Sequence, residues 1–158
     1  MIEESAMAKL TCFVIMPYQK EFDPVFETAR KAANLVPDDE VSCHWLKEVH
    51  AAGKITDDIL ESLHEADLCI ADVTGNNPNV MWETGFAMAL GKPTILIGQR
   101  IEMLPFDLKI HRVLNYELAA LDVLQEKLSK AIKQTLMRYD LKQGFQISPS
   151  ARAAGRPR

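Results

Sequence analysis

The stretch ADLCIADVTGNNPNVMWETGFAMALGKPTILIG, residues Ala66–Gly98, predicts a strand, a polar turn, an apolar helix and a second strand in direct succession. Its first apolar run, Leu68–Val73, and its last, Pro93–Gly98, are short and rich in β-forming side chains, as strands buried on both faces are. Pro78–Leu90 lies between them and predicts a helix. A strand, a helix and a second strand in this order favour a parallel sheet.

The segments on both sides of this unit continue the alternation of strands and helices. Such alternation predicts an α/β fold of three layers, in which helices cover both faces of a parallel sheet. With five strands, the flavodoxin-like order 2-1-3-4-5 is favoured. The further strands are expected at Leu10–Met16, Val41–Leu46 and Val113–Tyr116. The further helices are expected at Asp23–Leu35, at a segment that begins at Thr56 or Asp57, and at Leu118–Tyr139. Irregular chain is expected at Lys47–Lys54 and Ile101–His111.

Length and composition fit one soluble globular domain. The chain has 158 residues, of which 47% are hydrophobic and 25% charged, so one substantial core is expected. We expect residues 10–140 to form this domain, residues 1–9 to be a flexible N-terminus, and residues 141–158 to be a disordered basic tail. The formal net charge of −4 argues against a dedicated nucleic-acid binder.

The cysteines and the N-terminus indicate a cytoplasmic protein. Cys12, Cys43 and Cys69 are odd in number, lie in apolar runs and form no CxxC pair, so buried reduced thiols are expected rather than disulfides or a thiolate metal site. The four histidines show no HxxxH or HExxH spacing, so we expect no metal. Residues 1–9 lack the apolar core of a signal peptide. No apolar run reaches the roughly 20 residues that are needed to cross a bilayer.

Fold logic alone predicts where a ligand binds. In open α/β sheets, ligands bind beyond the carboxyl ends of the strands, where the strand order reverses. Here that crevice lies between the loops after the first and third strands. The candidate binding residues in and beside these loops are Pro17, Tyr18, Thr74, Gly75, Asn76, Asn79 and Trp82.

Several of these residues also have a structural explanation. Asn76 or Asn77 can cap the third helix, Pro78 fits its first turn, and Gly75 allows a positive φ. Tyr18 or Trp82 can stack on a base, or can simply be packed. The turn matches neither GxGxxG nor a P-loop, so classical dinucleotide or NTP binding is not indicated.

Two carboxylates stand out as candidate catalytic groups. Glu83 lies in the second turn of the third helix, on a face that it shares with Val80, Ala87 and Leu90. Desolvation there would raise its pKa, which fits either a catalytic residue or a carboxylate paired with a turn amide or a basic side chain. Asp72 ends the third strand, where it either takes part in catalysis or braces the turn.

The part of the sequence that contains these residues resembles the nucleoside 2-deoxyribosyltransferase-like superfamily. The resemblance is strongest to the branch of that superfamily that is similar to Toll/interleukin-1 receptor (TIR) domains. The resemblance rests on Phe13-Val14-Ile15-Met16-Pro17-Tyr18, Glu83-Thr84-Gly85-Phe86-Ala87 and Ala89-Leu90-Gly91-Lys92-Pro93, and spans about Leu10 to Gly98. It implies that Glu83 attacks the anomeric carbon of a ribosyl or deoxyribosyl group. It also implies that Asp72 binds substrate or protonates the leaving base.

The same resemblance sets the expected function and its alternatives. We expect cleavage of an N-glycosidic bond, in NAD+ or in a deoxynucleoside or its monophosphate, without a cofactor and in a homodimer or larger homo-oligomer. Asn77-Pro78-Asn79 replaces the Asp-Pro-Gly common in the transferases, which favours cleavage over base exchange. The alternative is a non-catalytic nucleotide-binding or TIR-like interaction module.

Overall fold

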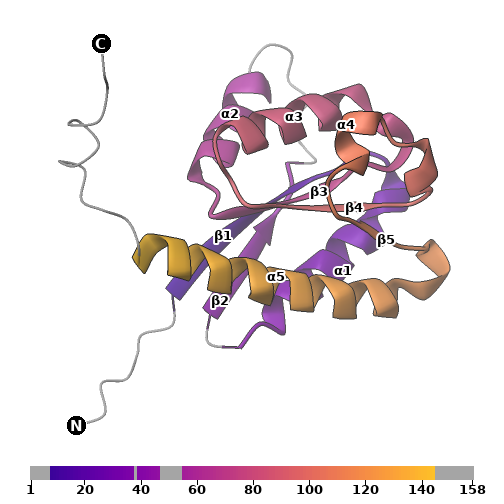
Figure 1. Ribbon diagram of the computed structural model, residues 1–158. Coiled ribbons are helices and arrows are strands. Elements are labelled where there is room, and N and C mark those ends of the chain that lie inside the picture. Colours follow the sequence, from indigo (N-terminus) through magenta and orange to yellow (C-terminus); the bar gives the residue numbers. More distant parts are fainter. Residues whose placement is uncertain (1–7, 38, 47–54, 145–158) are drawn as a thin grey trace, which may run out of the picture.

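The computed structural model describes residues 8–37, 39–46 and 55–144 and contains one five-stranded sheet with helices on both faces (Figure 1). The strand order is β2-β1-β3-β4-β5, and every neighbouring pair is parallel. This confirms the predicted flavodoxin-like order. The strands are β1 Ala8–Ile15, β2 Asp39–His44, β3 Leu68–Asp72, β4 Thr94–Gly98 and β5 Val113–Asn115, and the helices are α1 Asp23–Asn34, α2 Ile55–Glu65, α3 Pro78–Ala89, α4 Phe106–Lys109 and α5 Leu121–Gly144.

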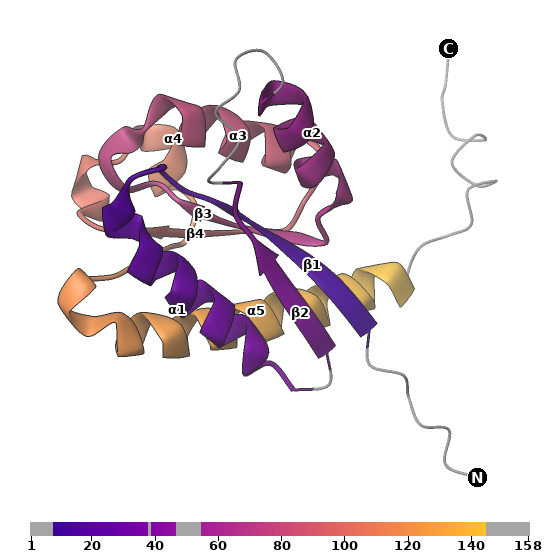
Figure 2. The same ribbon diagram turned by 180° about the vertical axis from the view of Figure 1, so that it is seen from behind.

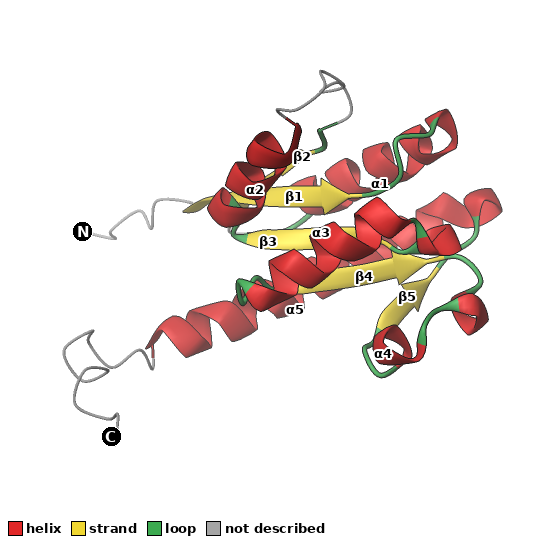
Figure 3. Ribbon diagram, turned by 90° about the horizontal axis from the view of Figure 1, so that it is seen from above, coloured by secondary structure: helices red, strands yellow, loops and turns green. Residues whose placement is uncertain are grey.

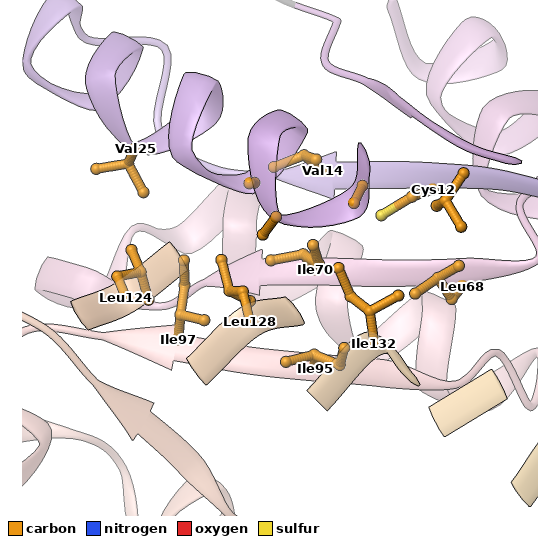
Figure 4. Close-up of a cluster of buried hydrophobic side chains, with 14 of the residues drawn as sticks. Cys12, Val14, Val25, Leu68, Ile70, Ile95, Ile97, Leu124, Leu128 and Ile132 are labelled. Atoms are coloured by element: carbon orange, nitrogen blue, oxygen red, sulfur yellow. The ribbon is translucent and has the colours of Figure 1, made fainter. Parts of the chain in front are cut away.

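Alternating side chains of the strands supply two separate cores. On one face of β1, Cys12 and Val14 pack with α1 and α5; on the other, Phe13 and Ile15 pack with α2 and α3. Figure 2 shows α1 and α5 together below the sheet and α2 and α3 above it. Figure 4 shows the first core, in which Leu124, Leu128 and Ile132 of α5 face Ile70, Ile95 and Ile97 of the sheet.

The parallel strands all end at one edge of the sheet, which we call the carboxyl edge. Figure 3 shows the arrowheads pointing the same way, toward the N-terminal ends of α1 and α3. All five residues of β3 are buried, because this strand is central in the sheet and covered on both faces. The strand order reverses between β1 and β3. The carboxyl edge at these two strands is therefore the predicted location of the ligand.

Several element bounds differ from prediction. β1 begins at Ala8, inside the segment expected to be a flexible N-terminus, and β2 spans Asp39–His44 instead of Val41–Leu46. Parallel pairing joins Ala8 to Asp39 and Lys9 to Glu40, so backbone bonds extend the pair beyond its apolar residues. Residues 1–7, the expected loop at 47–54, and 145–158 lie outside the described residues.

The C-terminal half contains more helix than predicted. The segment expected to be irregular contains a short 3₁₀ turn, Ile101–Met103, and the one-turn helix α4. A second 3₁₀ turn, Leu118–Ala120, precedes α5, which continues to Gly144 and so includes the first four residues of the expected disordered tail. Elements of three or four residues are too short to show a hydrophobic period, which explains why the pattern does not predict them.

Candidate active site

The loop after β1 brings an aromatic side chain to the carboxyl edge. Met16 and Pro17 are buried and Tyr18 is partly buried, directly before a 3₁₀ turn at Lys20–Phe22 and helix α1. The Tyr18 ring lies parallel to the Trp45 ring, with centroids 6.5 Å apart and an interplanar angle of 5°. Phe26 packs on the same indole at 5.4 Å. Trp45, which follows β2, was not predicted as a site residue, because nothing in its local sequence points to Tyr18.

Asp72 is completely buried at the end of β3 and accepts three hydrogen bonds. Its Oδ1 accepts from the backbone N–H of Thr74 at 3.0 Å and from the Thr74 hydroxyl at 2.5 Å. Its Oδ2 accepts from the Tyr116 hydroxyl at 2.6 Å. Burial raises the pKa of Asp72, while the bonds from Thr74 and Tyr116 act in the opposite direction. These contacts favour the brace over the catalytic role for Asp72.

The hydrogen bonds around Asp72 tie together the ends of three strands. The Gln99 backbone N–H, just after β4, donates to the Thr74 hydroxyl at 3.0 Å, and its side chain donates to the Tyr116 hydroxyl at 3.2 Å. Tyr116 follows β5 and lies 44 residues from Asp72. Tyr116 and Gln99 were not predicted as site residues. Their position at strand ends was the signal available in the sequence, but it does not single them out.

The turn between β3 and α3 has mainly structural contacts. Gly75 and Asn76 have positive φ values of 73° and 53°, and the Asn76 side chain donates to the Met103 carbonyl at 2.9 Å. Asn77 caps α3, since its side-chain oxygen accepts from the backbone N–H groups of Asn79 and Val80. Among the described residues, the Asn79 side chain has no hydrogen-bond partner, so its amide is available to a ligand.

Glu83 is nearly buried and unpaired in the described part of the chain. It is 5% exposed and belongs to the buried stripe of α3 with Val80, Thr84 and Ala87. No described residue forms a hydrogen bond or an ion pair with its carboxylate, while Thr84 bonds to the Val80 carbonyl of the same helix. Burial raises the pKa of Glu83 to about 7.

Glu83 and Tyr18 lie close enough to interact electrostatically, although they belong to different loops and helices. Burial and the negative charge of Glu83 together raise the pKa of Tyr18 to about 12. The two predicted groups are therefore brought together at the carboxyl edge. Trp82 lies off the buried stripe, is 51% exposed, and stacks on Phe86 with centroids 5.7 Å apart. Its predicted contact with a base stays a prediction.

The described residues show no preformed metal centre and no membrane span. No group of three or more His, Cys, Asp and Glu side chains in residues 8–37, 39–46 and 55–144 is arranged to hold a metal ion. Across those residues no helix combines the length and apolar character needed to cross a membrane. The three cysteines are free thiols.

Comparison with known proteins supports the fold. No family model and no curated protein sequence matches this chain. Among solved structures, the 2-desoxiribosyltransferase from Leishmania mexicana superposes with a TM-score of 0.52 and 18% sequence identity. The match covers 74% of this chain and 97% of the other. At this identity the similarity establishes the α/β architecture, and the chemistry has to be argued from the residues.

Proposed function

We propose that this protein cleaves the N-glycosidic bond of a nucleoside or nucleotide, with Glu83 as the nucleophile. The observation that carries the proposal is the 5% exposed carboxylate without a partner among the described residues, whose pKa burial raises to about 7. A carboxylate in such a position is costly for folding and is a candidate for chemistry. The fold shared with a 2-desoxiribosyltransferase supports the same reaction class.

The proposed reaction has two steps. In the first, a Glu83 oxygen attacks C1′ of the sugar, the C1′–N bond breaks, and its electron pair leaves with the base. In the second, water attacks C1′, loses a proton to solvent, and releases Glu83 as a carboxylate. A covalent glycosyl ester thus divides one difficult displacement into two easier ones. If a second base attacks C1′ instead of water, the same ester gives base exchange.

In this proposal the other residues bind and position the substrate. Tyr18, supported by Trp45, offers a ring for the base, and the Asn79 amide offers hydrogen bonds to the sugar or phosphate. Asp72 acts as a positioning residue, because its bonds to Thr74 and Tyr116 fix the turn before α3. Because Asp72 is occupied, a base that leaves without taking a proton suits this site best, and the nicotinamide of NAD+ is one such base.

A panel of substrates tests this proposal. The purified protein is incubated with NAD+, deoxynucleosides and deoxynucleoside monophosphates, and free base is measured by chromatography, with and without a second base as acceptor. Base release is expected from at least one of them. It should be abolished in Glu83→Gln and retained in Glu61→Gln, a matched control on the exposed face of α2. Base release by Glu83→Gln at the wild-type rate would refute the nucleophile.

The buried Asp72, which accepts three hydrogen bonds within the protein, also favours a second candidate function. Without a free acid for the leaving base, the carboxyl edge would bind a nucleotide as a signal, or the domain would act as a TIR-like interaction module, without turnover. The same panel separates the two candidates. Saturable binding of a panel compound without release of its base would support the non-catalytic module and exclude cleavage of that compound.

A further inference from the structure

A cavity lies away from the carboxyl edge, between α5 and the edge of the sheet formed by β4 and β5. Its volume is about 300 Å³, which is the lower limit of the usual range for small-molecule sites. Its apolar wall consists of Ile95, Leu114 and Ala131. In Figure 1, α5 passes below the strands that provide two of these side chains.

Four cationic side chains line this cavity, which we call the basic cavity. They are Arg112, Lys127, Lys130 and Arg138. Such a cluster is notable in a chain whose formal net charge is −4. The clustering has a simple origin, because positions 127, 130, 134 and 138 fall on one face of a helix. Arg112 immediately precedes β5 and lines the cavity together with Leu114, which packs against the core that contains α5.

Two of the four cationic side chains have partners within the protein, and the other two have none among the described residues. Lys127 donates to the Asn115 carbonyl at 3.1 Å, and Lys130 pairs with Glu126 at 2.8 Å. Arg112 and Arg138 form no hydrogen bond or ion pair with any other described residue. The planar guanidinium group binds phosphate through two parallel N–H donors. The two available groups are therefore well suited to one phosphate group.

We propose that the basic cavity binds a phosphate ester of about nucleotide size. Arg112 and Arg138 hold the phosphate, and the organic part lies on the wall of Ile95, Leu114 and Ala131. The apolar wall distinguishes this ligand from inorganic phosphate. The confinement of the four cations to one cavity of about 300 Å³ distinguishes it from a nucleic-acid strand, which would need an extended basic surface. The site is separate from Glu83 and does not depend on the proposed reaction.

NMR titration of the ¹⁵N-labelled full chain with AMP locates the binding directly. Saturable shifts are expected at the backbone amides of Leu114, Ala131 and Thr135, whatever happens at the amides near Glu83. Adenosine, which lacks the phosphate, should not shift these three amides. Pyrophosphate should bind more weakly than AMP, because it makes no use of the apolar wall.

A pair of double variants tests the assignment to the two arginines. Arg112→Gln with Arg138→Gln should weaken AMP binding at these amides by about tenfold or more, as expected for the loss of charge-assisted hydrogen bonds. Lys31→Gln with Lys133→Gln removes the same net charge from exposed positions on α1 and α5 outside the cavity. This control should keep the affinity for AMP within about twofold of wild type. If the arginine double variant does not fold, the two single variants replace it.

Four results would overturn the proposal. They are no saturable shift at the three amides, equal loss of affinity in the lysine control, pyrophosphate binding as tight as that of AMP, and binding of a single-stranded oligonucleotide without binding of AMP. The last result would identify a nucleic-acid surface in place of a small-molecule site.

Discussion

Replacing Glu83 by glutamine tests whether the carboxylate is a functional group kept at a cost or a paired structural one. Burial raises its pKa from an ordinary 4.5 to about 7. At a pH well above 7 the folded state carries a desolvated charge that the unfolded state hydrates. The rise in pKa corresponds to a penalty of up to about 3 kcal/mol in the free energy of unfolding. Glutamine has nearly the same shape and no charge, so it should remove this penalty.

The sign follows from the two pKa values. Below pH 4.5 the carboxyl group is protonated in both states and contributes no difference. Between 4.5 and 7 the unfolded state loses the proton first, so the folded state loses stability as the pH rises. Glu83→Gln should therefore be more stable than wild type by up to about 3 kcal/mol at pH 8.5, or roughly 6–12 °C in Tm. The gain should fade toward pH 4.5.

Urea unfolding followed by circular dichroism at pH 4.5, 6, 7 and 8.5 measures this difference. Other carboxylates titrate in both proteins, so their contributions cancel when the variant is compared with wild type. Glu61→Gln, at an exposed position, serves as the control and should follow wild type at every pH. If Glu83→Gln is less stable than wild type at pH 8.5, the carboxylate has a stabilising partner and its interpretation as an unpaired nucleophile is wrong.

Three further predictions concern the same edge of the sheet. Base release should rise with pH up to about 7 and then level off, because Glu83 attacks only when ionised; a kcat/KM profile that is flat from pH 5.5 to 8 would contradict this. Tyr116→Phe removes a donor from the buried Asp72 and should cost about 1.5–3 kcal/mol in urea unfolding; an unchanged midpoint would show that the bond does not brace the turn. Asn77→Ala removes the cap of α3 and should lower the free energy of unfolding by about 1 kcal/mol, as measured by thermal unfolding. Asn79→Ala, at a neighbouring exposed position, should lower it by less.

The fold was predictable because its main signals are local. Five apolar runs alternate with helical segments, and that alternation, with the rules for parallel sheets, leads to the observed strand order. The element bounds were less predictable. The pairing of Ala8 with Asp39 depends on backbone bonds between strands, and α4 is a single turn supported by its surroundings. Neither leaves a periodic pattern in the sequence.

The candidate site was predictable only in part, for a related reason. Glu83 is visible in the sequence because it is a lone charge in an apolar helix. Trp45 and Tyr116 are not, because their importance lies in contacts with Tyr18 and Asp72, which are distant in the sequence. The charged face of α5 is another example. In sequence it is a solvated helix surface, and only the edge of the sheet makes part of it the wall of a cavity.

The two carboxylates at the carboxyl edge show how this fold can separate structure from chemistry. Asp72 is buried and accepts three hydrogen bonds from Thr74 and Tyr116, which occupy three of the roughly four acceptor positions of a carboxylate. Glu83 accepts no hydrogen bond from the described residues, so its charged form is disfavoured until a ligand or a reaction stabilises it. In the proposed reaction, an electrophilic sugar carbon is such a partner. Under this proposal, burial that is costly in the free protein becomes reactivity toward C1′, provided that the buried Asp72 network holds α3 in place.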